Sequence, residues 1–340
     1  MRNENITAHA GVLSMAAIKT KMDLPMDEEV YCIDFYSSTR MLLYGGKNNK
    51  CIAVNVDTGD VVAVVEDFDD SVVFCKFLDS EKFIVGSLDG TISLMTFEGE
   101  INNVCLNEDI ARMKVLGDKI VVGTEMGNVH VLSLDLCFQN VCIGQHAEIL
   151  DVCYENGRVY TLSGSSFMTF DANTHQKLVG FKVKNGLCLD KIPESDVVCI
   201  GSENMIVISK NTSILAKIEV EGSPLCVLYM NNYFVIGGCF EYILLVNIPM
   251  GMRVFKIPLG SIEVWDIKGF GLNQIVFSTS CGLVGHGDIR DEKSFRLFRT
   301  DLGSIFDLCF KDQVVYAAGE NGYNVIDLYD TDDLECIGQR

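Results

Sequence analysis

The sequence has little of what marks disordered or membrane-spanning proteins. Only 5 of its 340 residues are proline, and no low-complexity or Gly/Ser-rich linker divides the chain, which excludes extensive disorder beyond about the first 25 residues. No apolar run approaches the roughly 20 residues of a membrane-spanning helix. The first residues also lack the basic and apolar segments of a secretory signal. We therefore expect a soluble, intracellular protein that does not bind membranes.

The 14 cysteines do not have the spacing of a disulfide framework or a metal site. No C-x-x-C pair occurs, and cysteines such as Cys32, Cys199 and Cys309 lie inside apolar strand-like runs. Free cysteine in such a context acts as a small buried apolar residue, and thiol-rich chains without pairing patterns are typical of reducing compartments. The sequence predicts a cytoplasmic protein, with the nucleus as a second compartment.

Positive charge is also scarce, with 27 Lys and Arg against 47 Asp and Glu, a formal net charge of −20. Binding to nucleic acid phosphates requires clustered Lys and Arg. This balance therefore argues against direct nucleic-acid partners and against anionic membranes. The natural complement of such a chain is a basic protein segment.

The sequence does contain an internal repeat. A short apolar strand ending in small residues is followed by a tight turn and an alternating strand, as in LLYGGKNNKCIAV from Leu42 and FIVGSLDGTISLM from Phe83. We place eight repeats at 30–68, 69–107, 108–144, 145–184, 185–221, 222–260, 261–300 and 301–340. Their lengths of about 40 residues are typical of four-stranded propeller blades.

Each repeat divides into four strand signals, which in the second repeat are 71–77, 81–86, 91–97 and 101–106. Asp89-Gly90 and Asn321-Gly322 predict type I′ hairpin turns. A single four-stranded sheet cannot bury both of its faces, whereas radial stacking buries them. The predicted fold is therefore an all-β single propeller at residues 30–340, of eight blades with seven as the alternative. Residues 1–29 form an N-terminal extension that could supply a closing strand.

The repeats resemble those of the WD40 family in a degenerate form. GSLDGTISLM from Gly86 is similar to the central hairpin of a WD40 unit, and Gly144-Gln145-His146 is similar to its Gly-His start. The Trp-Asp pair is missing from its usual place, where Val54-Asn55 and Phe170-Asp171 stand, and Trp265-Asp266 falls out of register on a first strand. We interpret Trp265 there as part of the core between blades rather than as a binding hot spot.

A narrower resemblance is to the angio-associated migratory cell protein family. It lies in the stretch from Val30-Tyr31-Cys32 to Gly45-Gly46, the acidic segment up to DSVVFCKF, the phrase HAEILDVCY from His146, and the count of eight repeats. Fungal members of that family are dedicated chaperones that hold the basic N-terminus of a new large-subunit ribosomal protein on an acidic propeller face. The resemblance implies the same role in ribosome biogenesis here.

Carboxylates concentrate where the d–a loops and b–c turns of a propeller meet at one face, with strands named a to d from the channel outward. The predicted partner-binding residues of this face are Asp27, Glu28, Glu29, Asp69, Asp70, Asp89, Glu108, Asp109, Glu125, Glu148, Glu203, Glu221, Glu241, Glu263, Asp301 and Glu320. The expected bases there are Lys47, Lys50 and Lys184. Polar loops are common in any acidic protein, so a solvated surface is the alternative interpretation.

No catalytic, metal or cofactor motif appears. The five histidines have no metal-ligand spacing, GLVGHGDIR from Gly282 lacks the order of a phosphate-binding loop, and Gly164-Ser165-Ser166 matches a hairpin turn rather than a nucleophile. SFRLFRT from Ser294 lacks the double Arg-Gly of phosphoinositide-binding propellers and predicts an outer strand.

The sequence thus predicts a monomeric, non-enzymatic platform without metal or cofactor that binds a basic segment, as a ribosomal-protein chaperone. The alternative is a scaffold or adaptor subunit of a stable complex, such as a coat, a ubiquitin-ligase receptor or a ribosomal RNA processing particle.

Overall fold

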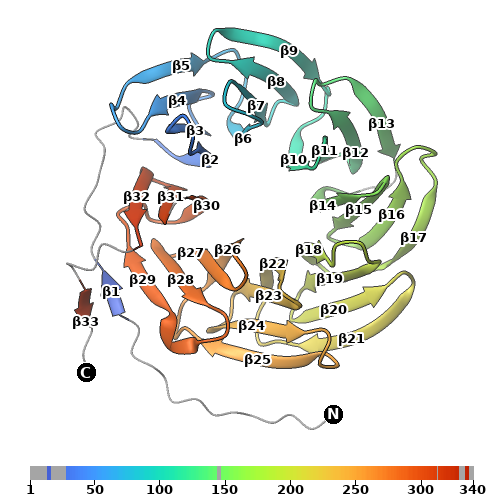
Figure 1. Cartoon of the computed structure of the whole chain (residues 1–340). Helices are drawn as coiled ribbons and strands as arrows, with labels where there is room; N and C mark the ends of the chain where they lie inside the picture. The colour runs from blue at the N-terminus through green and yellow to red at the C-terminus, as the bar shows by residue number, and fades with distance from the viewer. Residues whose placement is uncertain (1–13, 17–27, 144–146, 312, 329–333, 337–340) are drawn as a thin grey trace.

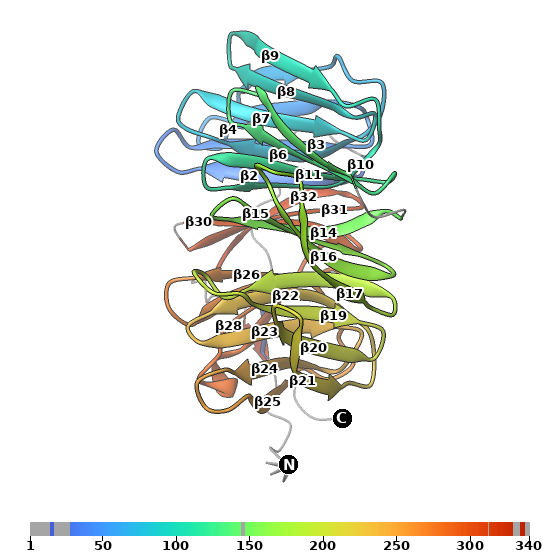
Figure 2. The same cartoon turned by 90° about the vertical axis from the view of Figure 1, so that its right-hand side faces the viewer.

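A computed structural model describes residues 14–16, 28–143, 147–311, 313–328 and 334–336 of the chain. It is a ring of radially arranged antiparallel sheets, seen along its axis in Figure 1 and edge-on in Figure 2. Strands make up nearly all of the regular structure, and a three-residue 3₁₀ helix, η1 (Glu292–Ser294), is the one helical element among the described residues. Within those residues no helix is long and apolar enough to cross a bilayer.

The sheets follow one another along the chain. Blade 1 contains β2 (Val30–Tyr36), β3 (Met41–Gly46), β4 (Cys51–Asn55) and β5 (Val61–Val65), and blade 2 contains β6 (Val72–Phe77), β7 (Lys82–Ser87), β8 (Thr91–Thr96) and β9 (Gly99–Cys105). Blade 3 contains β10 (Ile110–Leu116), β11 (Lys119–Thr124), β12 (Asn128–Ser133) and β13 (Phe138–Ile143), and blade 4 contains β14 (Ile149–Glu155), β15 (Arg158–Ser163), β16 (Ser166–Asp171) and β17 (Lys177–Lys182).

The second half of the ring repeats the arrangement. Blade 5 contains β18 (Gly186–Lys191), β19 (Val197–Ser202), β20 (Met205–Lys210) and β21 (Ser213–Glu219), and blade 6 contains β22 (Pro224–Met230), β23 (Tyr233–Gly238), β24 (Tyr242–Asn247) and β25 (Arg253–Pro258). Blade 7 contains β26 (Val264–Phe270), β27 (Gln274–Thr279), β28 (Leu283–Asp288) and β29 (Arg296–Arg299), and blade 8 contains β30 (Ile305–Lys311), β31 (Val314–Gly319) and β32 (Gly322–Asp327).

The predicted β-propeller of eight blades is confirmed, and the blades fall within the eight predicted repeats. GLVGHGDIR supplies the third strand of blade 7, β28, and SFRLFRT its outer strand, β29, as expected. The Asp89-Gly90 turn is not the predicted type I′ turn. A type I′ turn requires positive φ at both central residues, but only Gly90 (φ +88°) has it and Asp89 does not. The Gly90 N–H donates to the Ser87 carbonyl. This is the pattern of a type I turn that is followed by a glycine in the left-handed conformation.

The two ends of the described chain meet at blade 7. Strand β1 (Ser14–Ala16) pairs in parallel with β29, and β33 (Leu334–Cys336) pairs antiparallel with β1, so that both lie outside the ring in Figure 1. Within the described residues, blade 8 has three strands in its sheet, with β32 at the edge. The division into an extension at 1–29 and a propeller at 30–340 stays a prediction.

The core consists of apolar clusters between blades. Eight buried clusters occur, and each combines side chains from two neighbouring blades. The ring closes by the same kind of contact between blades 8 and 1, where Phe35 stacks on Tyr316 with ring centroids 4.5 Å apart and Tyr44 packs on Tyr323 at 4.9 Å. Sheets that are apolar on both faces thus bury both against their neighbours.

The buried cysteines contribute to these clusters, as expected. Cys32, Cys51 and Cys75 pack together between blades 1 and 2, and all twelve cysteines whose side chains are described are free. The expectation of burial is wrong for four of them, Cys105, Cys137, Cys239 and Cys281, which are exposed on outer strands and turns.

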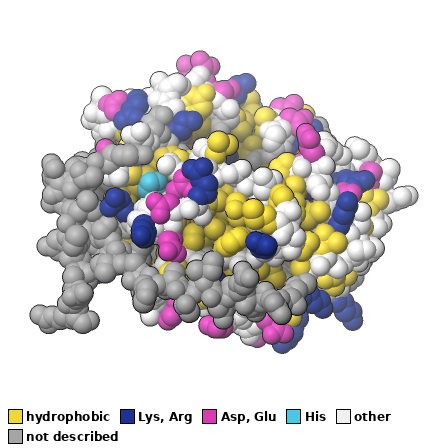
Figure 3. All heavy atoms as spheres, turned by 60° about the horizontal axis from the view of Figure 1, so that its bottom comes forward, with side chains coloured by type: hydrophobic (Ala, Val, Ile, Leu, Met, Phe, Trp, Pro, Cys, Tyr) yellow, Lys and Arg dark blue, Asp and Glu magenta, His cyan; other side chains and the backbone are white. Residues whose placement is uncertain are grey.

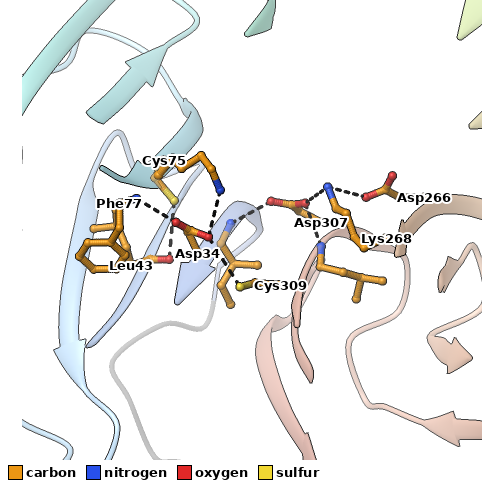
Figure 4. Close-up of polar contacts among 11 residues, drawn as sticks. Asp34, Leu43, Cys75, Phe77, Asp266, Lys268, Asp307 and Cys309 are labelled. Atoms are coloured by element: carbon orange, nitrogen blue, oxygen red, sulfur yellow. Dashed lines mark hydrogen bonds and ion pairs between the residues drawn. The ribbon is translucent and has the colours of Figure 1, made fainter. Parts of the chain in front are cut away.

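Aspartates on the innermost strands also link neighbouring blades. The innermost strands do not pair with one another, and carboxylates bridge them by accepting backbone N–H bonds from the next blade. Asp307 accepts from the Ile33 N–H at 3.1 Å and Asp34 from the Phe77 N–H at 2.8 Å, as Figure 4 shows. Asp151 accepts in the same way from the Leu189 N–H at 2.9 Å. These bonds fix the relative height of adjacent blades.

Asp151 is the most heavily engaged of these aspartates. Its carboxylate lies 2.6 Å from the Lys114 Nζ and 3.6 Å from the Arg112 Nε. Burial alone would raise the pKa of Asp151, but the charges of Lys114 and Arg112 outweigh burial and hold the pKa below its usual value.

We expect the Asp151→Asn substitution to destabilise the protein by about 2–3 kcal/mol at pH 7, because it removes the partner of two cations while its amide oxygen can still accept the Leu189 N–H. The ionised carboxylate stabilises the fold above its unfolded pKa of about 3.9. This contribution is lost as the pH falls through the lower pKa of the folded state.

Urea unfolding of the wild type and of the Asp151→Asn variant at pH 7 and at pH 3 measures the difference in their free energies of unfolding. The stability gap should shrink at the lower pH. Asp57→Asn, in an exposed pair with Arg40, is the control and should change stability by less than about 0.5 kcal/mol. A gap that is equal at both pH values would contradict the assignment.

Candidate functional site

The up-and-down order of strands brings all d–a loops and b–c turns to one end of the channel, and these loops and turns are here called the acidic loop face. The structure places there all of the predicted partner-binding residues except Asp27, which lies outside the described residues. Glu66 and Asp67 in the β5–β6 loop belong to it too, although the sequence interpretation omitted them. Seventeen described carboxylates therefore share this face with Lys47, Lys50 and Lys184.

The three lysines are engaged by carboxylates of the same face. The Nζ of Lys47 lies 3.0 Å from Glu29, that of Lys50 2.6 Å from Glu66, and that of Lys184 3.2 Å from Glu203. The Tyr31 hydroxyl, which donates to Glu29 at 2.5 Å, and the Lys47 ammonium hold the pKa of Glu29 below its usual value, as Lys184 does for Glu203. Glu29 and Glu203 therefore stay ionised at neutral pH although each is bonded to a lysine.

The predicted residues divide into two groups by their contacts. Some order the loops: Asp89 accepts from the Asp69 N–H at 2.8 Å and the Thr91 N–H at 2.7 Å, and Glu108 bonds with Thr124 at 2.6 Å and Asn128 at 2.8 Å. Exposed members point to solvent and are available to a ligand, and among them are Asp109, Glu125, Glu148 and Glu221. The sequence could not separate these groups, because the separation depends on side-chain partners.

The opposite end of the channel is less acidic. Its a–b and c–d loops carry three bases, Arg40, Arg290 and Lys293, and eleven described carboxylates, namely Asp57, Asp60, Asp79, Glu81, Glu98, Asp118, Asp135, Glu194, Asp196, Asp291 and Glu292. Figure 3 brings forward the rim of blades 6 and 7, where hydrophobic side chains gather with charges of both signs among them. Negative charge is thus most concentrated on the acidic loop face.

Sequence reasoning missed a second feature of this face. Each of the eight innermost strands has a register shift next to its second residue, which identifies a β-bulge there. A bulge leaves one residue unpaired and re-aims its side chain. All eight bulged residues are apolar or aromatic, half-buried, and line the channel; this bulge ring consists of Tyr31, Val73, Ala111, Leu150, Leu187, Leu225, Trp265 and Phe306.

Trp265 is therefore not part of the core between blades, and that interpretation was wrong. Its alternation with Val264 and Ile267 looked like a regular strand, but the bulge between Val264 and Asp266 turns the indole toward the channel. The signal that could have found the ring was the recurrence of an apolar residue at the second position of every innermost strand.

The bulge ring lies just inside the acidic loop face. Carboxylates stand two residues before several of its members, as in Glu29 and Tyr31 or Glu263 and Trp265. Tyr31 and Phe306 touch edge to face across the junction of blades 1 and 8, with centroids 5.5 Å apart. The channel that the ring opens into has a volume of about 890 Å³. An apolar mouth is thus surrounded by a negative rim.

Several charged side chains farther inside the channel are paired with one another. Lys268 lies 3.0 Å from Asp266 and 3.4 Å from Asp307, and the Asp266 charge, together with that of Asp307, raises the pKa of Lys268 despite its burial. Burial raises the pKa of Asp307, which Lys268 only partly offsets. Lys76 lies 3.5 Å from Asp34. Five Lys or Arg side chains and five Asp side chains line the channel, so the two signs of charge balance in number there.

Nothing in the described part of the chain forms a metal site, since no group of three His, Cys, Asp or Glu side chains is placed to hold an ion. The acidic rim around an apolar mouth offers a surface that another molecule could bind. The fold and the site define a propeller of the kind that acts as a protein-interaction module.

Comparison with known protein families identifies the family to which this propeller belongs. The profile of the WD40-like domain matches residues 28–326, and the chain belongs to that family. Among curated protein sequences none matches this chain.

Solved structures show the same fold. Sqt1 from Saccharomyces cerevisiae is similar at 15% identity and a TM-score of 0.79, covering 93% of this chain and 98% of the other. Sqt1 from Chaetomium thermophilum is similar at 11% identity and a TM-score of 0.80, covering 94% and 98%. A further structure of the Chaetomium protein, bound to the N-terminus of the ribosomal protein L10, matches at 12% identity and a TM-score of 0.79, covering 89% and 98%. At these identities the likeness establishes the fold.

We expect Glu108→Ala to destabilise the protein by about 1–2 kcal/mol, because it removes the carboxylate to which the fully buried Thr124 hydroxyl and the Asn128 amide donate. Glu125→Ala, on the exposed turn of the same blade, should change stability by no more than about 0.5 kcal/mol. Thermal unfolding of both variants separates loop-ordering from solvent-facing carboxylates. Equal losses would show that the division is wrong.

Proposed function

We propose that this protein binds a basic segment of another protein on its acidic loop face. The main support for this proposal is that seventeen carboxylates lie around one end of the channel with only three lysines, all of them in ion pairs. Clustered charge of one sign raises the local potential and accelerates encounter with a partner of opposite sign. The same clustering opposes folding through self-repulsion, so a binding role gives it a physical reason.

The partner that fits best is a newly made ribosomal protein of the large subunit, which this protein would escort before assembly. Ribosomal proteins carry Lys/Arg-rich segments that require neutralisation until they meet RNA. The similarity of the fold to Sqt1, of which one structure holds the N-terminus of the ribosomal protein L10, supports this choice of partner. Such an escort would work in the cytoplasm and reach the nucleus with its cargo.

One observation favours the scaffold alternative. Outer strands expose apolar side chains, among them Val61, Val62 and Val64 on β5 and Ile214 and Leu215 on β21. A permanent subunit of a complex would bury such strands against its neighbours. An escort would release its partner at moderate ionic strength, whereas a scaffold would keep its partners, because apolar contacts are not screened by salt.

The charge of the exposed carboxylates provides the test. We expect the quadruple variant Asp109→Asn, Glu125→Gln, Glu148→Gln and Glu221→Gln to bind a peptide of the ribosomal protein L10 N-terminus at least about tenfold more weakly at 50 mM salt, with a shallower salt dependence. Fluorescence anisotropy of the labelled peptide measures both. All four side chains are exposed, and within the described residues no hydrogen bond or ion pair holds them.

The matched control changes the same amount of charge at the opposite end of the channel, by Asp60→Asn, Glu98→Gln, Asp118→Asn and Glu194→Gln, and should bind like the wild type. Equal weakening in both variants would mean that net charge alone acts, and unchanged binding in the first variant would refute the proposal. A salt-resistant, stoichiometric set of partners in a pulldown from cell extract would favour the scaffold.

A further inference from the structure

The bulge ring places eight apolar side chains at the mouth of the channel, inside the acidic loop face. From this we infer that the bound basic segment carries one large apolar or aromatic side chain, which inserts into the ring as an anchor while flanking Lys and Arg meet the carboxylates. The inference rests on the proposed function and adds to it the feature by which the site would select among basic segments.

The geometry of the ring supports insertion from this end. A repeated bulge at the second residue of every innermost strand turns that side chain out of the blade and toward the channel. Tyr31, Leu225, Trp265 and Phe306 are half-buried, and part of each side chain stays open to the channel. Apolar surface that is left open within a polar rim marks a protein-binding site. Trp in particular is enriched among residues that dominate binding energy.

The charges beneath the ring argue against a cationic anchor. Lys268 is shared by Asp266 and Asp307, and Asp151 is shared by Lys114 and Arg112. A Lys or Arg that entered the channel would lose water and find these carboxylates already paired. An apolar side chain stops at the ring and needs no partner. The flanking charges then stay at the rim, where Glu148, Glu221 and Glu263 are exposed.

The size of the channel admits such an anchor. Its volume of about 890 Å³ lies in the range of pockets that hold a small ligand, roughly 300–1,000 Å³. Burial of an aromatic side chain against aromatic and aliphatic walls improves binding by about tenfold or more. The effect is insensitive to salt, unlike that of the acidic rim. The two contributions can therefore be measured separately.

The probes are two fluorescein-labelled peptides of 12 residues with identical Lys and Arg positions, one with a central Phe and the other with Ala. We expect the Phe peptide to bind the wild-type protein about tenfold more tightly than the Ala peptide, with the same salt dependence for both. Trp265 is the only tryptophan of the chain. Its emission should shift to the blue with the Phe peptide and not with the Ala peptide.

Two ring variants locate the anchor. Trp265→Ala and Leu225→Ala should each reduce the advantage of the Phe peptide over the Ala peptide to about twofold or less. Leu272→Ala, which removes a 76% exposed leucine from the a–b loop at the opposite end, is the control and should keep the full advantage. Leu225→Ala also retains the tryptophan signal, so the test survives if Trp265→Ala does not fold.

The outcomes separate the two proposals. Equal binding of both peptides with a clear salt dependence would overturn the anchor and leave the acidic loop face as the binding site. An advantage of the Phe peptide that persists in both ring variants would place the anchor elsewhere and also overturn the inference. Failure of both peptides to bind at low salt would overturn the proposed function together with the anchor.

Discussion

The four-stranded sheets of this protein are apolar on both faces, and each can bury those faces only against its two neighbours in the ring. All eight junctions are therefore apolar clusters built by two blades, and the junction of blades 8 and 1, with Phe35 on Tyr316, closes the ring in the same way as the others. Because the innermost strands do not pair, carboxylates such as Asp34, Asp151 and Asp307 carry backbone hydrogen bonds across the junctions. Closure fixes the diameter of the channel and hence the distances between everything that lines it.

The site is a consequence of that closure. The same bulge at the start of each innermost strand repeats around the ring, so eight side chains that are far apart in sequence meet at one opening. The loops that precede those strands carry the carboxylates, so negative charge surrounds the apolar opening. Internal ion pairs such as that of Lys268 with Asp266 and Asp307 compensate the charges farther inside. The carboxylates of the loops can thus attract a basic partner over a long range, and the bulge ring inside them can make apolar contacts at short range.

Much of the fold could be predicted because the repeats and the strand alternation are patterns within short stretches of the sequence. Repeats of about 40 residues with small residues at the end of the second strand, as at Gly45-Gly46 and Gly237-Gly238, place the blades, and a Cβ on these glycines would collide with a neighbouring strand or blade. The strand limits of blade 2 were predicted to within two residues. The pairing of β1 with β29, and of β33 with β1, was not predictable, since three-residue strands far apart in sequence carry no periodic signal.

The sequence by itself determined the all-β class, the eight repeats, the negative charge and the loops on which that charge lies, because each of these depends on composition or on spacing along the chain. Only the tertiary structure decided that Glu108 and Asp89 order loops while Glu125 and Glu221 face solvent, because this depends on which donors surround each carboxylate. It also decided the role of Trp265. Alternation along a strand suggests burial between sheets, but a bulge changes the side to which a residue points, and the bulge becomes visible only when the partner strand is in place.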